Sequence, residues 1–471
     1  MIFISYLITA QSTDLLYFIP ELIGANTLII ILLSIVPFLN RRIQAGWSTG
    51  FIIFVAAVLR LIFIRRSPEL SDDIFRYLFD GLMFLKGRNP YTAAPAAFLT
   101  DDSFLSALIT RINHPYLPTI YPPAAQFVFA AGAAMGGLAG IKLLLIMLDL
   151  LSCLLIIFLL DKLKRDRAWA VLYAWHPLPV IEIAASGHID AAAIFFILSA
   201  LAVIINKNVS SVAGETVLPM TRGSEITRAC TAGILFSAAA LTKWVPLIFL
   251  PGILLMTPSG SRKYAATAFL TATLAMIWFF RPEVANSFHT LSVYAANWEF
   301  SGFVFRLIRS LTGSGSIARA VIACGFSTLL ALMYFRYFRT ALPSSLMRAK
   351  KLLEIFYALS LSFLLLTPTL HPWYALYLAA FLPFAAGPAG IILSWSVFLA
   401  YRVLIFYGMT GQWVENDFIP LMIIIGPAAA FIAAVIIRSI NRSQKWRLPE
   451  IFRLNGAIDS VDRPDQSKRD Y

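Results

Sequence analysis

Three carboxylates, Asp72, Asp73 and Asp80, lie close together in the sequence, just after an apolar run that ends in Arg65 and Arg66. Two carboxylates held near each other repel, so one keeps its proton to a higher pH and can serve as a general base. Ionisable groups at the edge of a bilayer are costly unless they have a function. The cluster therefore predicts a catalytic segment beside an apolar region.

The spacing of Asp73, Tyr77 and Asp80 places these side chains on one face of a short helix. An alternative interpretation is structural. Ser71 or Asp72 would cap the helix N-terminus, and a second acid in the first turn would be favoured by the helix dipole. Both interpretations stay open from the sequence.

Three other polar stretches interrupt apolar segments and are expected on the same face: Glu182 with Ser186–Asp190, the lone Lys243, and His371 with Trp373 and Tyr374. Each has an ordinary explanation, because long cations extend to the membrane interface and aromatic residues gather there. Their convergence on one face together with the aspartates favours a functional site.

Arg65 and Arg66 lie next to the acids, where a pair of guanidinium groups is suited to bind a phosphate. They can equally form ion pairs with Glu69 or Asp72, and the two roles are compatible. Gly and Pro residues in 87–91 and 113–123 predict turns, and within them His114 could reach a ligand.

The elements that must position these groups are membrane helices. The chain of 471 residues is 59% hydrophobic and 13% charged, whereas soluble domains have roughly 25% charged residues. Its net charge of +13 comes mainly from Lys and Arg in short segments between apolar runs, which set membrane orientation and do not indicate a nucleic-acid partner. The three cysteines lie in apolar stretches without metal-ligand spacing.

Apolar runs of suitable length predict an all-α polytopic fold of about thirteen transmembrane helices. They lie near residues 18–39, 47–64, 141–160, 168–185, 190–206, 229–242, 244–257, 264–281, 317–336, 351–368, 373–387, 389–408 and 417–437. Basic residues in the connecting segments should be cytoplasmic, and they fall on one side if the apolar residues 123–137 lie along the outer surface without crossing.

This topology places the C-terminus in the cytoplasm, the N-terminus outside, and the segment from about 65 to 140 on the non-cytoplasmic face. No nucleotide sugar or ATP is available there, so an activated substrate must arrive on a lipid. We expect one transmembrane domain over 1–443 and a loosely ordered polar tail over 444–471. The N-terminus lacks the basic region of a signal peptide and is expected to be retained.

Six motifs in order resemble the GT-C class of integral-membrane glycosyltransferases, and within it the bacterial polyprenol-phosphate-mannose-dependent mannosyltransferases. They are Asp-Asp-Ile-Phe-Arg-Tyr-Leu-Phe-Asp-Gly at 72–81, Gly-Arg-Asn-Pro-Tyr at 87–91, Ile-Tyr-Pro-Pro at 120–123, Gly-His-Ile-Asp-Ala at 187–191, Leu-Thr-Lys at 241–243 and His-Pro-Trp-Tyr at 371–374. The resemblance implies a multi-pass protein of the bacterial cytoplasmic membrane with an outward-facing active site.

The resemblance also implies a reaction. A sugar, expected to be mannose, passes with inversion from a polyprenyl phosphate to a hydroxyl of a glycan, glycolipid or other acceptor. The general base would be Asp73, whose spacing to Tyr77 is similar to the Asp-x-x-x-Tyr arrangement of several relatives, or else Asp72.

Other residues receive binding roles on the same basis. The donor phosphate would be bound by Lys243, Arg65, Arg66 and, after them, His371. The substrate-binding residues would be Asp80, Arg76, Tyr77, His188, Asp190, Tyr121 and His114. No metal site or other cofactor is predicted, and a divalent cation is left open. We expect no large soluble domain after the last predicted span, of the kind that some GT-C members use for acceptor recognition.

The main alternative is a polytopic transporter or flippase for a lipid-linked or anionic substrate. A transporter predicts inverted repeats and polar groups near the bilayer midplane. Few charges, notably Arg60 and Arg402, are expected there, whereas the acids crowd one outer face. That asymmetry favours an enzyme, and it requires Asp73, Lys243 and His371 to meet at one site.

Overall fold

The computed structural model describes residues 6, 18–43, 47–99, 103–208 and 221–443. The tail predicted over 444–471 and most of the N-terminal segment predicted to be retained lie outside these residues. Within them every regular element is a helix, which confirms the all-α prediction. The β pairing found there consists of isolated bridges that join Phe300 and Ser301 to Thr369.

The first half of the chain alternates long helices with short helical turns. Two helices come first, α2 (Ile19–Ile43) and α3 (Thr49–Leu61). The predicted outer segment then forms α4 (Asp73–Leu85), η1 (Pro95–Phe98), α5 (Ser103–Ile109) and α6 (Pro123–Ala134). There follow α7 (Gly137–Lys162), η2 (Arg167–Ala170), α8 (Val171–Ala174), η3 (Pro179–Ala185), α9 (Asp190–Asn208), α10 (Arg222–Thr242), η5 (Val245–Phe249), α11 (Leu250–Met256), η6 (Ser259–Ser261) and α12 (Arg262–Phe279).

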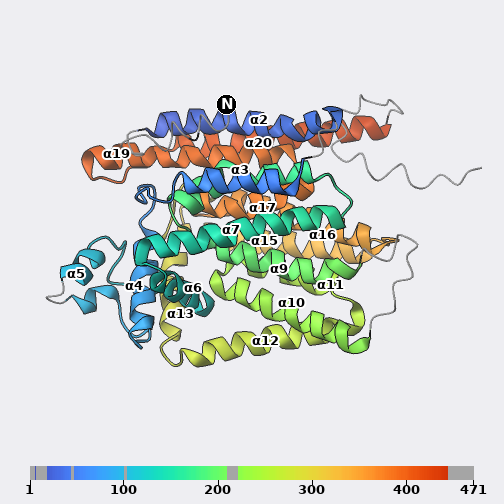
Figure 1. Cartoon of the computed structure of the whole chain (residues 1–471). Helices are drawn as coiled ribbons and strands as arrows, with labels where there is room; N and C mark the ends of the chain where they lie inside the picture. The colour runs from blue at the N-terminus through green and yellow to red at the C-terminus, as the bar shows by residue number, and fades with distance from the viewer. Residues whose placement is uncertain (1–5, 7–17, 44–46, 100–102, 209–220, 444–471) are drawn as a thin grey trace, which may run out of the picture.

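The second half begins with two shorter helices, α13 (Ala285–Asn297) and α14 (Phe303–Thr312). The remaining elements are α15 (Gly315–Arg339), α16 (Ser345–Leu366), η7 (Pro372–Tyr374), α17 (Ala375–Ala385), α18 (Pro388–Ser396), η8 (Val397–Tyr401), α19 (Arg402–Thr410) and α20 (Phe418–Ser443). In Figure 1 the long helices run in roughly the same direction, while α4, α5 and α13 gather toward one end of the bundle.

Five helical segments among the described residues are long and apolar enough to cross a membrane: 19–37, 137–162, 315–339, 388–410 and 418–437. The predicted spans 168–185 and 190–206 meet instead at a bend of 120° and count together as one further candidate. The predicted total of about thirteen is therefore not confirmed. Several of the other predicted spans are interrupted by 3₁₀ turns or prolines, as in η5–α11, and this shortens their apolar length.

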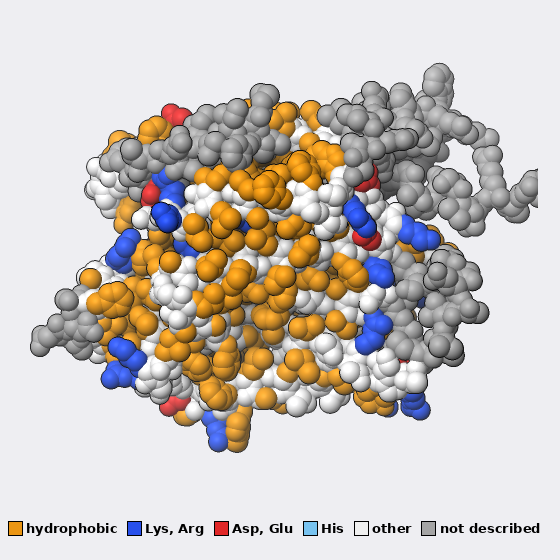
Figure 2. All heavy atoms as spheres, viewed as in Figure 1, with side chains coloured by type: hydrophobic (Ala, Val, Ile, Leu, Met, Phe, Trp, Pro, Cys, Tyr) orange, Lys and Arg blue, Asp and Glu red, His pale blue; other side chains and the backbone are white. Residues whose placement is uncertain are grey.

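The surface fits a membrane protein. Figure 2 shows hydrophobic side chains over the middle of one face, with Lys, Arg, Asp and Glu mostly toward its two ends. Large apolar side chains such as Leu311, Phe338 and Phe431 are exposed, which is stable where lipid surrounds them.

A buried charge within the bundle, that of Arg60, is neutralised by a neighbour. Arg60, which is fully buried, lies 2.5 Å from Asp149, and Tyr173 donates a hydrogen bond to the same carboxylate. Arg402, the other charge expected near the midplane, is exposed. A buried charge that keeps a hydrogen-bonded partner is explained by packing, so the Arg60 pair does not require a transport pathway.

Helix α6, which was predicted to lie along the outer surface, packs against α4 and the beginning of α7. The contact with α4 is very close, since a Cβ at Gly81 would lie 2.5 Å from the carbonyl oxygen of Phe129. Aromatic packing continues the contact, because Tyr77 stacks on Phe129 at 4.5 Å between ring centroids. This packing holds the first turns of α4 in place.

Candidate active site

Asp73 opens helix α4, and Asp72 occupies the N-cap position before it. The Asp72 side chain makes no capping hydrogen bond, and the Ser71 hydroxyl instead accepts one from the Asp73 amide at 3.4 Å. The capping interpretation therefore does not account for the Asp72 carboxylate. Burial, together with the neighbouring Asp73 charge, raises the pKa of Asp72 to about 7.

Polar side chains from several elements surround Asp73. Its Oδ2 atom lies 3.8 Å from His188 Nδ1, and its side chain keeps 28% of its surface exposed. The hydroxyls of Tyr77 and Tyr121 and the charges of Lys243 and Asp190 lie close enough to affect its ionisation. Burial raises the pKa of Asp73, and Lys243 and the two hydroxyls oppose the rise.

The other acids nearby are fully buried and committed to partners. Asp190 receives the Lys243 ammonium at 2.7 Å, and Asp80 receives the Arg76 guanidinium at 2.9 Å. The Tyr401 hydroxyl lies 2.8 and 2.9 Å from the two carboxylate oxygens of Glu182. Asp73 differs from these three because it is partly exposed and makes no ion pair with Lys or Arg among the described residues.

The tip between η3 and α9 brings His188 beside Asp73. Gly187 at this tip has φ +82°, and a Cβ there would lie 2.4 Å from Cδ1 of Ile74 in α4. Only glycine combines this backbone conformation with so close an approach. The Gly-His-Ile-Asp sequence thus bends the chain and places His188 and Asp190 against the start of α4.

A column of aromatic rings leads away from His188. Trp373 lies between two imidazoles and stacks on His188 and on His371, each at 4.2 Å between ring centroids. His371 in turn stacks on Phe300 at 4.8 Å, and Trp413 packs against Phe300 at 5.5 Å. The column connects the 371–374 motif with the 298–302 segment and the loop after α19.

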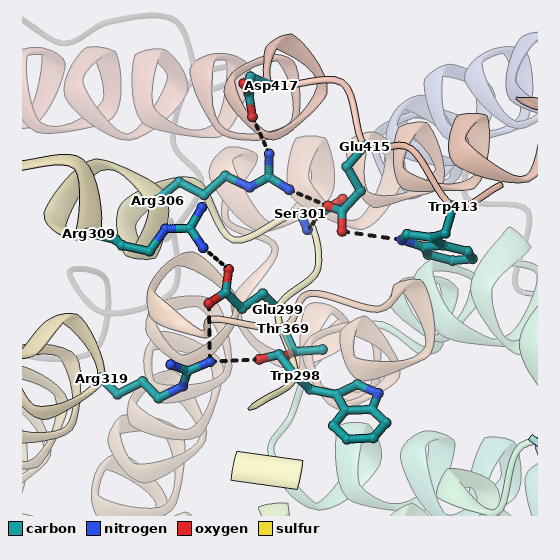
Figure 3. A network of polar contacts seen from close by, with 10 residues as sticks. All are labelled: Trp298, Glu299, Ser301, Arg306, Arg309, Arg319, Thr369, Trp413, Glu415 and Asp417. Atoms are coloured by element: carbon teal, nitrogen blue, oxygen red, sulfur yellow. Dashed lines mark hydrogen bonds and ion pairs between the residues drawn. The ribbon is translucent and has the colours of Figure 1, made fainter. Parts of the chain in front are cut away.

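Hydrogen bonds fix the 298–302 segment at the Phe300 end of this column. The Phe300 amide donates to Pro368 O at 3.1 Å, and the Phe300 carbonyl accepts from the Leu370 amide at 2.7 Å. Figure 3 shows the ion pairs around it, in which Glu299 meets Arg309 and Arg319. Glu299 and arginines from two helices, α14 and α15, thereby hold Phe300 against His371.

The same network includes the loop before α20. Glu415 accepts from Arg306, from the Ser301 amide at 3.1 Å and from the Trp413 indole at 3.3 Å, as Figure 3 shows. Arg306 also pairs with Asp417. The two loops, 298–302 and 411–417, are therefore bound to each other beside the aromatic column.

The Gly-Arg-Asn-Pro-Tyr motif has an architectural role. Asn89 donates to Glu283 at 3.0 Å, and Asn286 donates to the Tyr91 carbonyl at 2.8 Å, so the motif anchors the beginning of α13. Further along α13, the Tyr294 hydroxyl makes a 2.8 Å hydrogen bond with that of Tyr374. Lys243 lies 5.1 Å from the centroid of the Tyr374 ring, which links α13 to the site.

The structure brings most of the predicted site residues together. Asp72, Asp73, Tyr77, Tyr121, His188, Asp190, Lys243 and His371 lie in or beside one cluster, as their contacts and mutual electrostatic effects show. Asp73, Lys243 and His371, which the enzyme interpretation requires at one site, are among them.

The remaining predicted residues have other contacts. Arg66 pairs with Glu69 at 2.8 Å, one of the two ion pairs anticipated for it, and Arg65 is exposed. Arg76 pairs with Asp80 and donates a hydrogen bond to the Leu117 carbonyl. This bond joins α4 to the loop that contains Leu117. His114 contacts Tyr116 and Trp298.

Sequence reasoning did not single out Phe300, Tyr294 and Tyr377, although all three adjoin the site. Each is an aromatic residue within an apolar or amphipathic stretch, so no local pattern distinguishes it from a packing residue. Among the described residues, no group of three or more His, Cys, Asp or Glu side chains is arranged to hold a metal ion.

A comparison of the sequence with protein-family models identifies the family of this chain. The family model described as "MptA_B_family: Alpha-(1->6)-mannopyranosyltransferase, N-terminal domain" matches residues 6–259, more than half of the chain. The matched region includes Asp73, His188, Asp190 and Lys243, and ends before His371. Searches of curated proteins and of solved structures gave no match. The chain therefore belongs to the MptA/B family of alpha-(1->6)-mannopyranosyltransferases, and it is a glycosyltransferase of the GT-C type that its motifs resemble.

Proposed function

We propose that this protein transfers mannose from a polyprenyl-phosphate donor to a hydroxyl acceptor on the non-cytoplasmic face of the bacterial cytoplasmic membrane, with inversion and with Asp73 as the general base. The family description names a (1→6) bond. We therefore take the acceptor hydroxyl to be the 6-hydroxyl of a glycan or glycolipid.

The observation that carries the proposal is the state of Asp73. It is partly exposed and has no Lys or Arg ion pair within the described part of the chain, whereas Asp190, Glu182 and Asp80 are buried and committed to partners. A general base must reach the substrate proton and must be free to accept it. Asp72 also has a raised pKa, but Asp73 is the aspartate that lies beside Lys243, Tyr77 and Tyr121.

The raised pKa of Asp73 suits the reaction. A carboxylate with a higher pKa binds the acceptor proton more strongly, provided that it is ionised at the working pH. As the acceptor oxygen attacks the anomeric carbon, its proton passes to Asp73. The bond between that carbon and the phosphate oxygen breaks, and its electron pair leaves with the polyprenyl phosphate.

The leaving phosphate needs a cation, and Lys243 is the one within the cluster. Its side chain is 15% exposed and its ammonium lies against Asp190, so a phosphate can approach it from the exposed side. His371, which belongs to the aromatic column, lies near enough to be affected by the charge of Lys243. We assign Arg65 and Arg66, which lie in the segment before α4, to the approach of the lipid phosphate and not to the reacting centre.

The positions of the ends of α7, α9 and α10 support a location of the site on the non-cytoplasmic face. α7 begins near α4 and α6 and ends at Lys162, α9 begins at Asp190 and ends at Asn208, and α10 begins at Arg222 and ends beside Lys243. The site therefore lies at one end of these helices, and the basic segments 162–167 and 222–228 lie at the other. Since cytoplasmic segments collect Lys and Arg, the site belongs on the outer face, where a lipid-linked donor is available.

The test of this function is a comparison of donors with the full-length protein in vesicles. We expect mannose transfer to a mannoside acceptor from polyprenyl-phosphate mannose and none from a nucleotide-activated mannose. The product linkage, determined by NMR, should have the anomeric configuration opposite to that of the donor. Transfer from the nucleotide sugar alone, or retention of configuration, would overturn the proposal.

A further inference from the structure

Four buried side chains around Asp73 carry polar atoms that have no hydrogen-bond partner among the described residues. They are the Tyr77 and Tyr377 hydroxyls, Oδ1 of Asp190 and both ring nitrogens of His188. Polar neighbours lie near them without completing a hydrogen bond of good geometry: Asp73 near Tyr77, Asp190 near Tyr377, and Glu182 Oε2 at 3.5 Å from His188 Nε2. All four residues are at most 1% exposed. A buried polar atom that lacks a partner destabilises the folded protein, so several at one place indicate a polar ligand.

We propose that Tyr77, His188, Asp190 and Tyr377 form the subsite that binds the hydroxyl groups of the transferred mannose. The inference rests on the proposed function and deepens it by naming the groups that recognise the sugar. Tyr377, in α17, lies beyond the residues that the family model matches and was not expected from any motif.

The contacts of Asp190 connect this subsite to the donor phosphate. Its Oδ2 atom receives Lys243 at 2.7 Å, while Oδ1 has no partner and lies near the Tyr377 hydroxyl. In the donor, the sugar is bonded to an oxygen of the same phosphate that Lys243 would bind. The sugar hydroxyls closest to the phosphate therefore come within reach of Asp190 and Tyr377.

The opposite side of the subsite borders the general base. Tyr77 shares the α4 face with Asp73, and His188 Nδ1 lies 3.8 Å from Asp73. A sugar held by these side chains thus lies between the cation that stabilises the leaving group and the carboxylate that takes the acceptor proton. An inverting displacement requires such an order of groups.

The chemistry of the four side chains matches a pyranose. Each sugar hydroxyl both donates and accepts, and the set offers a carboxylate acceptor, two phenol hydroxyls and an imidazole that can donate or accept. Trp373, stacked on His188, adds an aromatic surface next to these polar groups. Hydroxyl groups bound to desolvated partners are discriminated strongly, because a missing hydroxyl leaves the partner unpaired.

The test measures kcat/KM of one variant, Tyr377→Phe, and of the native enzyme with a set of donors. Tyr377→Phe removes a buried hydroxyl that lies near Asp190 and completes no hydrogen bond of good geometry, so the thermal stability should change little. Its kcat/KM with polyprenyl-phosphate mannose should fall about tenfold. Tyr173→Phe is the matched control, because the Tyr173 hydroxyl bonds to Asp149 away from the site, and it should lower stability without this loss.

The decisive measurement uses 2-, 3-, 4- and 6-deoxymannosyl donors. One of them should be a poor donor for the native enzyme, by about tenfold, and should lose nothing more in Tyr377→Phe. If every deoxy donor loses the same factor in both proteins, the subsite is wrong although the transferase activity stands. If the native enzyme transfers no mannose from the lipid donor, the proposed function fails and the subsite fails with it.

Discussion

At the scale of single residues, the environment of each carboxylate determines what it can do. Asp190 and Asp80 have the same chemistry as Asp73, but each is fully buried against a cation, at 2.7 Å from Lys243 and 2.9 Å from Arg76. Each of these acids is already engaged in an ion pair, so neither is suited to be the base. Asp73 combines partial exposure with a pKa that burial raises, and this combination suits a base that exchanges protons with a substrate.

The raised pKa of Asp73 predicts the pH dependence of the enzyme. The base works in its ionised form, so kcat/KM should fall about tenfold per pH unit below the pKa of Asp73, and this fall should begin above the ordinary carboxyl value of about 4. Lys243 lowers that pKa. In Lys243→Met the fall should therefore begin at a higher pH than in the native enzyme.

The measurement is a pH profile of kcat/KM for both proteins under conditions in which both remain folded. A profile of the native enzyme that falls only near pH 4, or one that Lys243→Met shifts to lower pH, would contradict the assignment of Asp73.

Residues of the candidate site could be predicted from the sequence where charged residues are rare. In a chain with 13% charged residues, Asp73, Lys243 and Asp190 are conspicuous, and the structure brings them together. Phe300 and Tyr377 could not be predicted, because aromatic residues are common throughout the chain and only the fold shows which of them meet the site. The partner of Arg66 also required the structure, since the sequence offered an ion pair with Glu69 or Asp72 and a phosphate equally.

At the scale of elements, two devices place the reactive groups. The glycine at 187 allows the η3–α9 tip to approach α4, and the ion-pair network of Figure 3 holds the Phe300 segment against the 371–374 motif. The sequence predicted the tips themselves, since polar residues interrupt apolar runs there. It did not predict the bend of 120° or the network, because both depend on contacts between distant segments.

Substitution of Gly187 should disturb the site strongly. In Gly187→Ala the new Cβ would be 2.4 Å from Cδ1 of Ile74, and an alanine disfavours φ +82°. We expect a loss of at least about 2 kcal/mol of stability together with a large loss of transfer activity. Thermal unfolding and a transfer assay on the same protein preparation would measure both.

A second substitution separates the two causes. Ile74→Val removes the Cδ1 atom that the new methyl group would meet, so the double variant should recover part of the activity while keeping the backbone strain. Gly325→Ala in α15, where a Cβ would meet nothing within 4 Å, is the matched control and should behave like the native protein. Equal behaviour of Gly187→Ala and Gly325→Ala would show that the tip does not position the site.

At the scale of the whole molecule, the candidate site lies at one end of helices α7, α9 and α10, and the basic segments 162–167 and 222–228 lie at the other. Composition predicted the all-α membrane class, and the helices follow the predicted apolar runs closely. The number of spans was less predictable, because 3₁₀ turns and prolines divide several apolar runs into pieces shorter than a bilayer requires. Helix α6 illustrates the ambiguity: its sequence is apolar, yet it is short and packs beside α4.

The most direct test of the account compares Asp73→Asn with Asp72→Asn for mannose transfer from polyprenyl-phosphate mannose. Asparagine keeps the shape of the side chain and cannot accept the proton, so Asp73→Asn should lower kcat by about 10²- to 10⁴-fold. Donor binding and thermal stability should stay near the native values, and Asp72→Asn should keep activity within about threefold. Near-native transfer by Asp73→Asn, or a large loss confined to Asp72→Asn, would contradict the central claim that Asp73 is the base.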